Sequence, residues 1–527
     1  MRNRLTITLT AIACCVMCRA ASGVDSQALE NNVLVEYSSS GADVTYASNL
    51  DGLLTVQISG AHVSIIQDAS IASEVLYTLQ GSSSDGSFWM DGEYKISVIL
   101  NGLTLTCADS AAINIRDGKR IAVEIADGTV NTLVDGSGGS QKGCFIVNGH
   151  TEVRGGGELN ITGNVKHAFF GDEYLELKKS TGTINILGAK KDGINVNEYM
   201  LMNGGTVNIS GVGDDGIQVS YAGDGTEGDG SVTINAGEIN IEVTATAAKG
   251  LKCDDNLTIA GGTINITTSG SAECDDDDND ISACSCIKAD GDISISDGEI
   301  ILSSTGDGGK GINGSGDITV SDGKIAVATS GATYSDNGHS TTARGIKADG
   351  HITLDGGLLL VNSPEDAAAL HCDSSFTVNG GTFVALGGSS TQADATASEQ
   401  PTLTLSGATY AEGDYIALSD GEGTYLFAYR LQRSYSAAEL VVSDGEMTAG
   451  GTYAVESGVE VSGGTSWQGY IDDASSITSS VSKVEVATDC DGAEQWYTID
   501  GRAASSTSAP GAYIVKRNGK SAKVIVR

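Results

Sequence analysis

The sequence has little proline, few aromatic residues and few basic ones. Only 3 of its 527 residues are Pro, which excludes a collagen-like chain, because collagen needs far more proline and a strict triplet repeat. Its 30 basic residues face 68 acidic ones, and the formal net charge is −38. Nucleic acids and anionic membranes would be repelled by such a surface, so we expect neither as a partner. Cations, and polymers held through cations, remain compatible with it.

Long apolar runs are also missing after the first residues, so we expect no membrane-spanning segment. Residues 1–20 have the features of a secretory signal peptide, because Arg2 and Arg4 precede a short apolar stretch that ends in small residues. Lipid attachment at Cys14 or Cys15 is the alternative. Cleavage would remove three arginines and change the charge to −41. We predict export through the periplasm, with the mature chain secreted or on the outer cell surface.

The cysteines give a weaker signal. Eight remain after the signal peptide, and an even number in an exported protein suggests some disulfides. Cys274 and Cys284 flank an acidic loop and could close it. No pair of CxxC motifs is present, which argues against a structural zinc site.

Glycine, in contrast, is abundant, and short apolar motifs that often begin with Gly recur through the middle of the chain. Their apolar anchor residues are Ile194, Ile217, Leu251, Ile287, Ile312, Ile346 and Leu370. The anchors are 23 to 36 residues apart, which indicates a solenoid with a repeat of roughly 24 residues and some insertions. Strands of three to five residues alternate with Gly or Asp turns, and no helical period is present. The sequence therefore predicts an all-β fold, a right-handed parallel β-helix of about ten coils, followed by a small β-rich C-terminal region.

This pattern divides the chain into five regions. The signal peptide (1–20) precedes an N-terminal linker or cap (21–45) and the parallel β-helix (46–390), which we expect to be the carbohydrate-binding domain. A β-rich cap or linker (391–480) and a C-terminal domain (481–527) complete the chain.

Alternation along each repeat predicts which side chains face the solvent. The anchor and the residue two positions later should point inward, and the residues one and three after the anchor should point outward. The position two before the anchor should add to the same outer face. The residues expected to contact a ligand there are Lys252, Lys288, Asp290, Lys347, Asp349 and His371. The alternative is that Lys–Asp pairs only keep this face soluble.

Carboxylates and amides on adjacent repeats point to a cation site. Asp214 and Asp215 should lie one coil from Asp192, at roughly 5 Å, the spacing of neighbouring strands. Oxygen ligands at this density are what Ca²⁺ takes. The predicted metal ligands are Asp192, Asn195, Asp214, Asp215, Gln218, Asp254 and Asp255. The acidic segment 273–280 is a second candidate, with a solvated insertion as its alternative.

The stretch from about 45 to 390 resembles bacterial carbohydrate-binding β-helix proteins whose fold is similar to that of pectate lyases. The resemblance rests on five segments: Ile96 to Thr106, Ala111 to Ile113, Asp127 to Leu133, Lys191 to Asn195 and Gly213 to Ile217. It implies binding of cellulose or pectin, with calcium held on the helix. The Asp-Gly-Ile pattern fades after residue 217, where Lys249, Lys310 and Arg344 replace the acid, so the resemblance does not extend calcium sites to the later coils.

The C-terminal end resembles the sorting domain of type IX secretion substrates. The matching segments are Trp496 to Arg502, Pro510 to Val515, Gly519-Lys520 and Lys523 to Arg527. This resemblance implies display on, or release from, the surface of a cell with two membranes. The alternative is a small β-sandwich without a sorting role.

Three functions follow from these patterns. The first is calcium-dependent binding of a polysaccharide by a monomer, with an acidic polymer such as polygalacturonate favoured over cellulose because, of the 3 Trp, only Trp89 falls in the repeats. The second is a polysaccharide lyase, in which Lys249, Lys252 and Lys288 would be the candidate bases beside calcium. Stacked Asp residues also meet the carboxylate spacing of a glycosidase, but they do so trivially. The third function is a structural surface adhesin.

Overall fold

The computed structural model describes residues 30–223, 225–275, 280–420 and 422–478, together with four later strands. The predicted signal peptide lies outside these residues. The chain divides into two compact units: unit 1 comprises Met1–Ser231 and Ala236–Asn240, and unit 2 comprises Val232–Asn235 and Ile241–Arg527. Each unit is described by itself below. No helix in the described part of the chain is long and apolar enough to cross a membrane.

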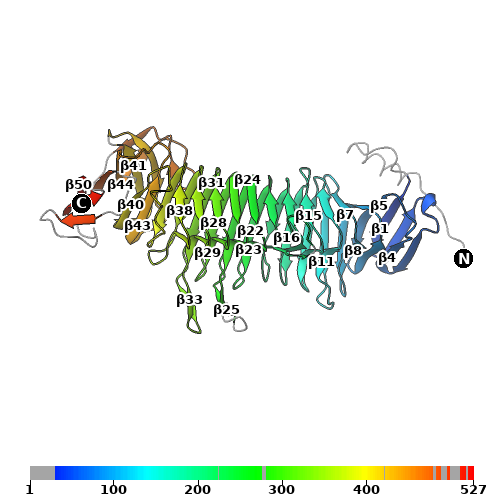
Figure 1. The fold of residues 1–527 in the computed structure, drawn as a ribbon. Helices are drawn as coiled ribbons and strands as arrows, with labels where there is room; N and C mark the ends of the chain where they lie inside the picture. The colour runs from blue at the N-terminus through cyan, green and yellow to red at the C-terminus, as the bar shows by residue number, and fades with distance from the viewer. Residues whose placement is uncertain are drawn as a thin grey trace. The chain divides into compact units, whose positions relative to one another are not determined.

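In unit 1, seven strands form a ladder in which neighbours run parallel, and Figure 1 shows them side by side. They are β4 (Ala61–Gln67), β6 (Gly86–Gly92), β8 (Ile113–Asp117), β11 (Gly143–Val147), β14 (His167–Gly171), β17 (Ile194–Asn197) and β20 (Ile217–Ser220). An antiparallel strand, β3 (Leu54–Ser59), precedes the ladder and pairs with β4.

The ladder is held in register by a column of large apolar side chains. Phe88, Ile113, Phe145, Phe169, Ile194 and Ile217 are aligned across successive strands. Every member is buried, and the rings of Phe145 and Phe169 meet edge to face at 5.4 Å between centroids. The predicted anchors Ile194 and Ile217 therefore lie in the core, as do Val196 and Val219 two positions later. Burial of these side chains supplies the main driving force for the stack.

Two further layers of parallel strands complete unit 1. The first contains β1 (Asn32–Ser38), β5 (Val75–Ser83), β7 (Ile96–Cys107), β9 (Ile121–Ile125), β12 (Thr151–Arg154), β15 (Leu175–Leu177) and β18 (Met200–Met202). The second continues from β7 through β10 (Val130–Asp135), β13 (Glu158–Gly163), β16 (Thr183–Ala189) and β19 (Thr206–Ile209). An antiparallel strand, β2 (Gly41–Tyr46), pairs with β1, and a short 3-10 helix, η2 (Ser48–Leu50), follows it.

An asparagine ladder runs along the outer side of the second layer. Asn185 donates from Nδ2 to Asn160 Oδ1 (2.8 Å), and Asn208 donates in the same way to Asn185 (2.8 Å). Asn240, at the end of unit 1, donates to Asn208 Oδ1 (2.9 Å). At the other end, Asn160 Nδ2 donates to Glu158 Oε1 (2.9 Å). Amide side chains in equivalent positions thus satisfy one another from strand to strand.

Unit 2 repeats the anchor ladder with five parallel strands. They are β23 (Lys249–Cys253), β27 (Ser285–Ala289), β29 (Lys310–Gly314), β34 (Arg344–Ala348) and β37 (Leu370–Cys372). The predicted anchors Leu251, Ile287, Ile312, Ile346 and Leu370 are aligned and buried. The small residues two positions later also point inward, because each of them is buried.

The other layers of unit 2 are longer. One comprises β21 (Val232–Ile234), β24 (Leu257–Thr268), β28 (Ile293–Ser304), β30 (Ile318–Val320), β35 (Ile352–Leu354) and β38 (Phe376–Val378). Another continues from β28 through β31 (Lys324–Thr329), β36 (Leu358–Asn362) and β39 (Thr382–Gly387). Strand β22 (Glu238–Val243) begins in unit 1 and ends in unit 2. Two hairpins, β25 (Glu273–Asp275) with β26 (Asp280–Ser282) and β32 (Tyr334–Asp336) with β33 (His339–Thr341), project from these layers (Figure 1).

Antiparallel strands follow the parallel ones in unit 2. β43 (Tyr435–Ser443) pairs with β39 and with β40 (Leu403–Tyr410). A further sheet contains β41 (Tyr415–Asp420), β42 (Tyr425–Arg430), β44 (Thr452–Ser462), β45 (Tyr470–Ile471), β46 (Ser476–Thr478) and β47 (Ser482–Ala487). Buried side chains such as Leu360, Phe427 and Leu440 join these strands to the end of the parallel layers in one apolar cluster. Finally, β48 (Gln495–Thr498), β49 (Gly511–Arg517) and β50 (Lys520–Val526) form an antiparallel sheet of their own.

The prediction of a right-handed β-helix solenoid of about ten coils is wrong. The anchors form parallel ladders of seven strands in unit 1 and five strands in unit 2, and the chain forms two compact units. In each unit the parallel layers close around buried side chains in a barrel-like way, with further strands outside them. The repeat is less regular in the early strands, because their anchors include Phe88, Phe145 and Phe169 in place of the Gly-Ile motif of the later ones. The crossover rule on which the right-handed solenoid rested is a statistical preference, and the period of a repeat carries no information about handedness or closure.

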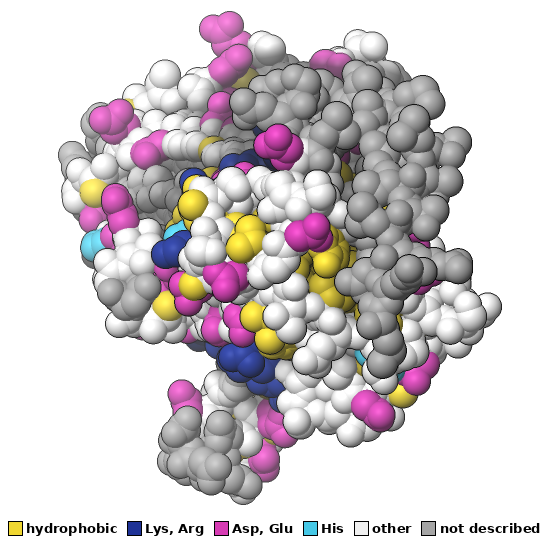
Figure 2. All heavy atoms as spheres, turned by 90° about the vertical axis from the view of Figure 1, so that its right-hand side faces the viewer, with side chains coloured by type: hydrophobic (Ala, Val, Ile, Leu, Met, Phe, Trp, Pro, Cys, Tyr) yellow, Lys and Arg dark blue, Asp and Glu magenta, His cyan; other side chains and the backbone are white. Residues whose placement is uncertain are grey.

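All described cysteines are free thiols, including Cys274 and Cys284, so the predicted closure of the acidic loop by a disulfide is absent. The surface is acidic, as its composition requires. On the face drawn in Figure 2, acidic side chains are spread over the surface, and the basic ones gather in small groups.

Asp117 of β8 is expected to weaken the fold at neutral pH. Its side chain is buried; Oδ1 accepts the Lys119 N–H (2.9 Å), whereas Oδ2 has no hydrogen-bond partner. Burial raises the pKa of Asp117 from 3.8 to about 6. Between these pH values the native state holds a proton that the unfolded chain has lost, so stability falls as pH rises. Asp117→Asn should therefore raise the unfolding free energy above pH 6 by about 1–3 kcal/mol.

Urea unfolding at pH 4 and at pH 7 checks this prediction. Asp51→Asn, at an exposed site in unit 1, is the matched control and should change neither value. A variant at Asp117 that is less stable than the parent at pH 7 would contradict the assignment of a buried, destabilising carboxylate.

Candidate functional site

Three carboxylates of unit 1 lie together at the starts of neighbouring strands. One oxygen each of Asp192, Asp214 and Asp215 lies within 4.8 Å of the others. The parallel pairing of β17 with β20 explains this arrangement, because it places Lys191-Asp192-Gly193 one strand away from Asp214-Asp215-Gly216. Asp192 and Asp215 are each only 6% exposed, whereas Asp214 is half-buried. The expectation that this position is fully outward-facing is wrong for these two residues.

Hydrogen bonds fix the carboxylates in place. Asp192 Oδ2 accepts from Asn195 Nδ2 (2.7 Å), and Asp192 Oδ1 accepts from the backbone N–H of Asp215 (3.2 Å). Lys191 Nζ donates to Asp214 Oδ2 (2.9 Å), and this bond raises the pKa of Lys191. The group therefore carries three acids against one exposed lysine, which leaves a net negative, partly buried site.

His167 belongs to the same column, which sequence reasoning missed. Its Nδ1 is buried without a hydrogen bond and lies 3.2 Å from Asp192 Oδ2. The sequence pattern places His167 in this column, because it precedes the anchor Phe169 by two residues. Asp192 and Asp215 precede their anchors Ile194 and Ile217 by the same spacing.

The predicted amide ligands occupy the neighbouring column. Asn195 and Gln218 are opposite each other in the register of β17 and β20. Asn195 donates its amide nitrogen to Asp192, so its Nδ2 faces the carboxylate, and it would have to rotate to offer an oxygen to a cation. Gln218 is buried and donates to Ser220 Oγ (3.0 Å). Asn195 thus orients Asp192, and Gln218 lies opposite Asn195 on the next strand.

In unit 2 the outward column consists of ion pairs. Lys252 Nζ lies 4.0 Å from Asp254 Oδ1, Lys288 Nζ lies 2.5 Å from Asp290 Oδ1, and His371 Nε2 lies 3.1 Å from Asp373 Oδ1. Lys347 pairs in the same way with Asp349. Each basic residue thus contacts the acid two positions later, which directly follows the end of its strand. Asp254 and Asp255 follow β23 directly, and their predicted role as metal ligands stays a prediction.

The lysines expected as lyase bases are engaged in contacts. Lys249 donates to Ala247 O (2.6 Å) and to Ser282 Oγ (2.8 Å), while Lys252 and Lys288 pair with acids. A different lysine, Lys310, has an unusual environment. It is buried, and burial, with the charges of Arg344 and Lys347, lowers its pKa to about 7. A polymer on the surface could not reach its amine, so Lys310 does not fit the role of a base.

A shallow groove in unit 2 brings together charged residues and a tryptophan. Its floor is made of stacked turns with Gly262, Gly298, Gly323 and Gly357, and Asp297, Glu299, Asp322 and Lys324 line it. These four glycines have positive φ values, which favours glycine there and leaves the backbone uncovered. Trp467, from the β-rich region, donates its Nε1 to Glu299 Oε1 (2.9 Å), and Lys324 Nζ lies 6.0 Å from its ring. Nothing in the repeat pattern indicated that Trp467 would lie here.

The two ends of the acidic segment lie in a pair of short strands. β25 and β26 pair antiparallel, with Glu273 opposite Ser282 and Asp275 opposite Asp280. Residues 276–279 lie outside the described residues. Both alternatives for this segment, a calcium loop and a solvated insertion, fall on those residues.

Comparison with known families decides the broad class of the protein. A family profile described as carbohydrate-binding domain-containing protein matches residues 59–331 and 308–395, which together exceed half of the chain. The chain belongs to this family. The match includes the three carboxylates of unit 1 and the glycine turns of the groove. It ends before residues 481–527, so the resemblance of that region to a sorting domain stays a prediction, and the resemblance to pectate lyases is not confirmed.

The chain is similar to one curated protein and to one solved structure among those compared. A carbohydrate-binding domain-containing protein of Acetivibrio thermocellus is 24% identical over 154 residues, which is 27% of this chain and 50% of that protein. The chain thus spans about half the length of the curated relative it matches. A solved structure described as the polysaccharide lyase-like protein from C. thermocellum, a gadolinium derivative, is 18% identical, and the match covers 56% of this chain and 93% of that one with a TM-score of 0.34.

Proposed function

We propose that the protein binds an acidic polysaccharide with the help of calcium held by Asp192, Asp214 and Asp215. The observation that carries the proposal is the meeting of these three carboxylates within 4.8 Å, with two of them buried. Membership of a carbohydrate-binding family supports the polysaccharide as partner. Export to the outer cell surface or the medium, and a monomeric state, belong to the same proposal.

The donor set fits a hard divalent cation in part. Buried carboxylates close together repel one another, and a cation relieves that repulsion. Calcium takes six to eight oxygen ligands, so these three side chains would supply only part of the shell. Water and the carboxylates of a uronate polymer would supply the remaining ligands. A bound calcium would neutralise the site and attract a polyanion that the chain's own charge repels.

A binding assay with a chelator tests this proposal. Polygalacturonate is titrated calorimetrically into the protein in calcium and again in excess chelator, and we expect binding only with calcium. Asp215→Asn should weaken calcium binding about 10- to 100-fold, because it removes one charged ligand from the buried group. Asp172→Asn is the matched control, since Asp172 pairs with Lys142 (3.4 Å) in the same unit and outside the group.

Three outcomes would contradict the proposal. Binding that is unchanged by chelator would remove calcium from the mechanism. If Asp215→Asn and Asp172→Asn weakened binding equally, the overall negative charge of the protein would matter and the three-carboxylate group would not. New ultraviolet absorbance from unsaturated products would replace binding by lyase chemistry, for which the contacts of Lys249, Lys252 and Lys288 give no support.

The groove at Trp467 favours a second ligand class. Aromatic rings commonly form the wall on which a neutral sugar stacks, and Trp467 is held beside the acidic side chain of Glu299. Binding of cellulose oligosaccharides that is unaffected by chelator and abolished by Trp467→Ala would point to this groove. Binding that survives the substitution would exclude it.

A further inference from the structure

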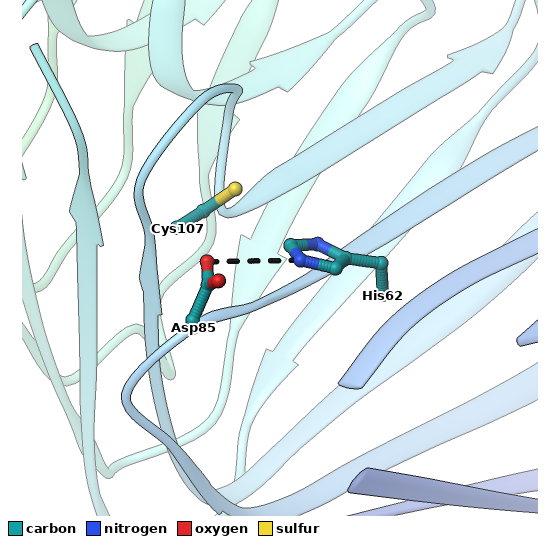
Figure 3. A group of neighbouring side chains, drawn as sticks. All are labelled: His62, Asp85 and Cys107. Carbon is teal, nitrogen blue, oxygen red and sulfur yellow. Dashed lines mark ion pairs between the residues drawn. The ribbon is translucent and has the colours of Figure 1, made fainter. Parts of the chain in front are cut away.

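A second group of metal-ligand side chains lies elsewhere in unit 1. His62, Asp85 and Cys107 each offer one ligand atom, and these three atoms lie within 4.8 Å of one another. Figure 3 shows the three side chains turned toward a common space, with His62 and Asp85 joined by an ion pair of 3.6 Å between Nε2 and Oδ1. The residues are 22 or more positions apart in the sequence, so no short sequence motif indicates the group.

The fold brings them together at one corner of successive strands. His62 is the second residue of β4, Asp85 lies in the turn between β5 and β6, and Cys107 is the last residue of β7. The pairing of β4 with β6 sets His62 opposite Ser87, and the pairing of β5 with β7 ends at Leu105, two residues before Cys107. The positions of these three side chains are therefore determined by the strand register.

The histidine is oriented for coordination. Its Nδ1 lies 3.0 Å from Ser87 Oγ, which holds the imidazole ring through one nitrogen. The other nitrogen, Nε2, then faces Asp85 at 3.6 Å, which is too long for a hydrogen bond. A ring nitrogen held by a second partner while the other faces an open site is the usual arrangement of a metal-binding histidine.

The cysteine adds a soft ligand. Cys107 is buried and is a free thiol, and its Sγ lies 3.1 Å from Ser110 Oγ. Thiolate and imidazole are poor ligands for calcium, which takes oxygen, but they are the preferred ligands of zinc. The chemistry of this group thus differs from that of the three carboxylates at Asp192.

We propose that His62, Asp85 and Cys107 form a zinc site with its fourth position open. Zinc bonds of about 2.0–2.3 Å in a tetrahedron require ligand atoms roughly 3.5 Å apart, so the group has to contract by about 1 Å. Asp85 permits this because it lies in a turn and its side chain is 61% exposed. The side chain of His62 is 40% exposed, so water or a ligand reaches the remaining position. Binding releases the thiol proton of Cys107 to the solvent, so the affinity decreases in acid.

Titration of the full chain with cobalt tests the metal site, and it does not require that the molecule at the open fourth position be known. The protein is stripped with chelator and titrated with Co²⁺, and we expect one equivalent to produce a thiolate-to-cobalt charge-transfer band and intense tetrahedral bands. Zinc should remove these bands, and calcium in excess should not. Cys107→Ser should abolish the charge-transfer band, and His62→Asn should weaken binding at least 10-fold.

Matched controls are present in the chain. His351→Asn removes a histidine whose Nδ1 likewise lies near a serine hydroxyl, Ser375 Oγ, at 2.8 Å. Cys274→Ser removes the one described thiol that is not buried. Both should leave the cobalt spectrum unchanged, as should Asp215→Asn, which separates this site from the calcium proposal.

Two results would overturn the proposal. One is the absence of a charge-transfer band in the parent protein, and the other is a band that survives Cys107→Ser or disappears with Cys274→Ser. If Cys107→Ser does not fold, His62→Asn and Asp85→Asn remain decisive, because Asp85 is exposed and His62 is only half-buried. A spectrum unchanged by either substitution excludes the coordination of that residue.

Discussion

Replacing Phe145 with alanine is expected to lower the free energy of unfolding by about 3–5 kcal/mol, the usual result of truncating a buried aromatic side chain. Phe145 is 1% exposed and lies in the anchor column between Ile113 and Phe169. Its ring packs edge to face on that of Phe169, and such pairs contribute about 0.5–1.5 kcal/mol beyond their buried area. The substitution would leave a cavity that the fixed strand spacing cannot close.

Denaturant unfolding followed by circular dichroism measures this loss. Phe145→Leu should retain much of the stability, because leucine keeps most of the apolar volume. Val130→Ala is a control at a strand residue that is 56% exposed, and it should change the value little. A loss below about 1 kcal/mol for Phe145→Ala would mean that the anchor column does not carry the stability assigned to it.

The second large effect concerns pH and Lys310. Its amine donates to Gly308 O (2.8 Å), to Thr341 Oγ1 (2.8 Å) and to Thr342 O, and its pKa is lowered to about 7. Between pH 7 and the ordinary lysine value of about 10.4, the unfolded chain binds a proton that the native state does not. The unfolding free energy therefore rises with pH in this window, by up to about 1.4 kcal/mol per pH unit from this group.

Lys310→Met should remove that slope. The variant also leaves three oxygens without a donor, which costs about 1–3 kcal/mol at every pH, so the difference in slope is the diagnostic quantity. Unfolding free energies are measured from pH 7 to 9.5 for the parent, for Lys310→Met and for Lys288→Met, whose lysine pairs with Asp290. The Lys288 variant should run parallel to the parent. If the unfolding free energies of Lys310→Met and of the parent ran parallel with pH, the Lys310 amine would be charged in the native parent throughout this range.

Much of the local structure could be predicted from the sequence, because alternation and glycine turns report burial directly. The anchors Ile194 to Leu370 and the small residues two positions later are buried as expected. The hand of the stack, the closure of its layers and the division into two units could not be read from the repeats. These properties depend on how whole layers pack, and a repeat of about 24 residues is compatible with several arrangements.

The candidate sites also differ in whether the sequence alone could predict them. Asp192, Asp214 and Asp215 could be grouped from the sequence because equivalent positions of adjacent repeats become neighbours. His62, Asp85 and Cys107 occupy unequal positions, in a strand, a turn and a strand end, so only the folded chain brings them together. Trp467 reaches its groove from a region without repeats, and no periodicity could have placed it there.

The asparagine ladder has a polarity. Each amide in the row from Asn240 to Asn160 gives its NH₂ group to the oxygen of the amide before it, and the last NH₂ group meets the carboxylate of Glu158. The amide dipoles therefore add head to tail, and each bond strengthens the next. Deamidation of one member, a slow reaction of ageing proteins, would replace its NH₂ group by an oxygen. Two oxygens would then face each other, and the row would be interrupted on a chain that already carries excess negative charge.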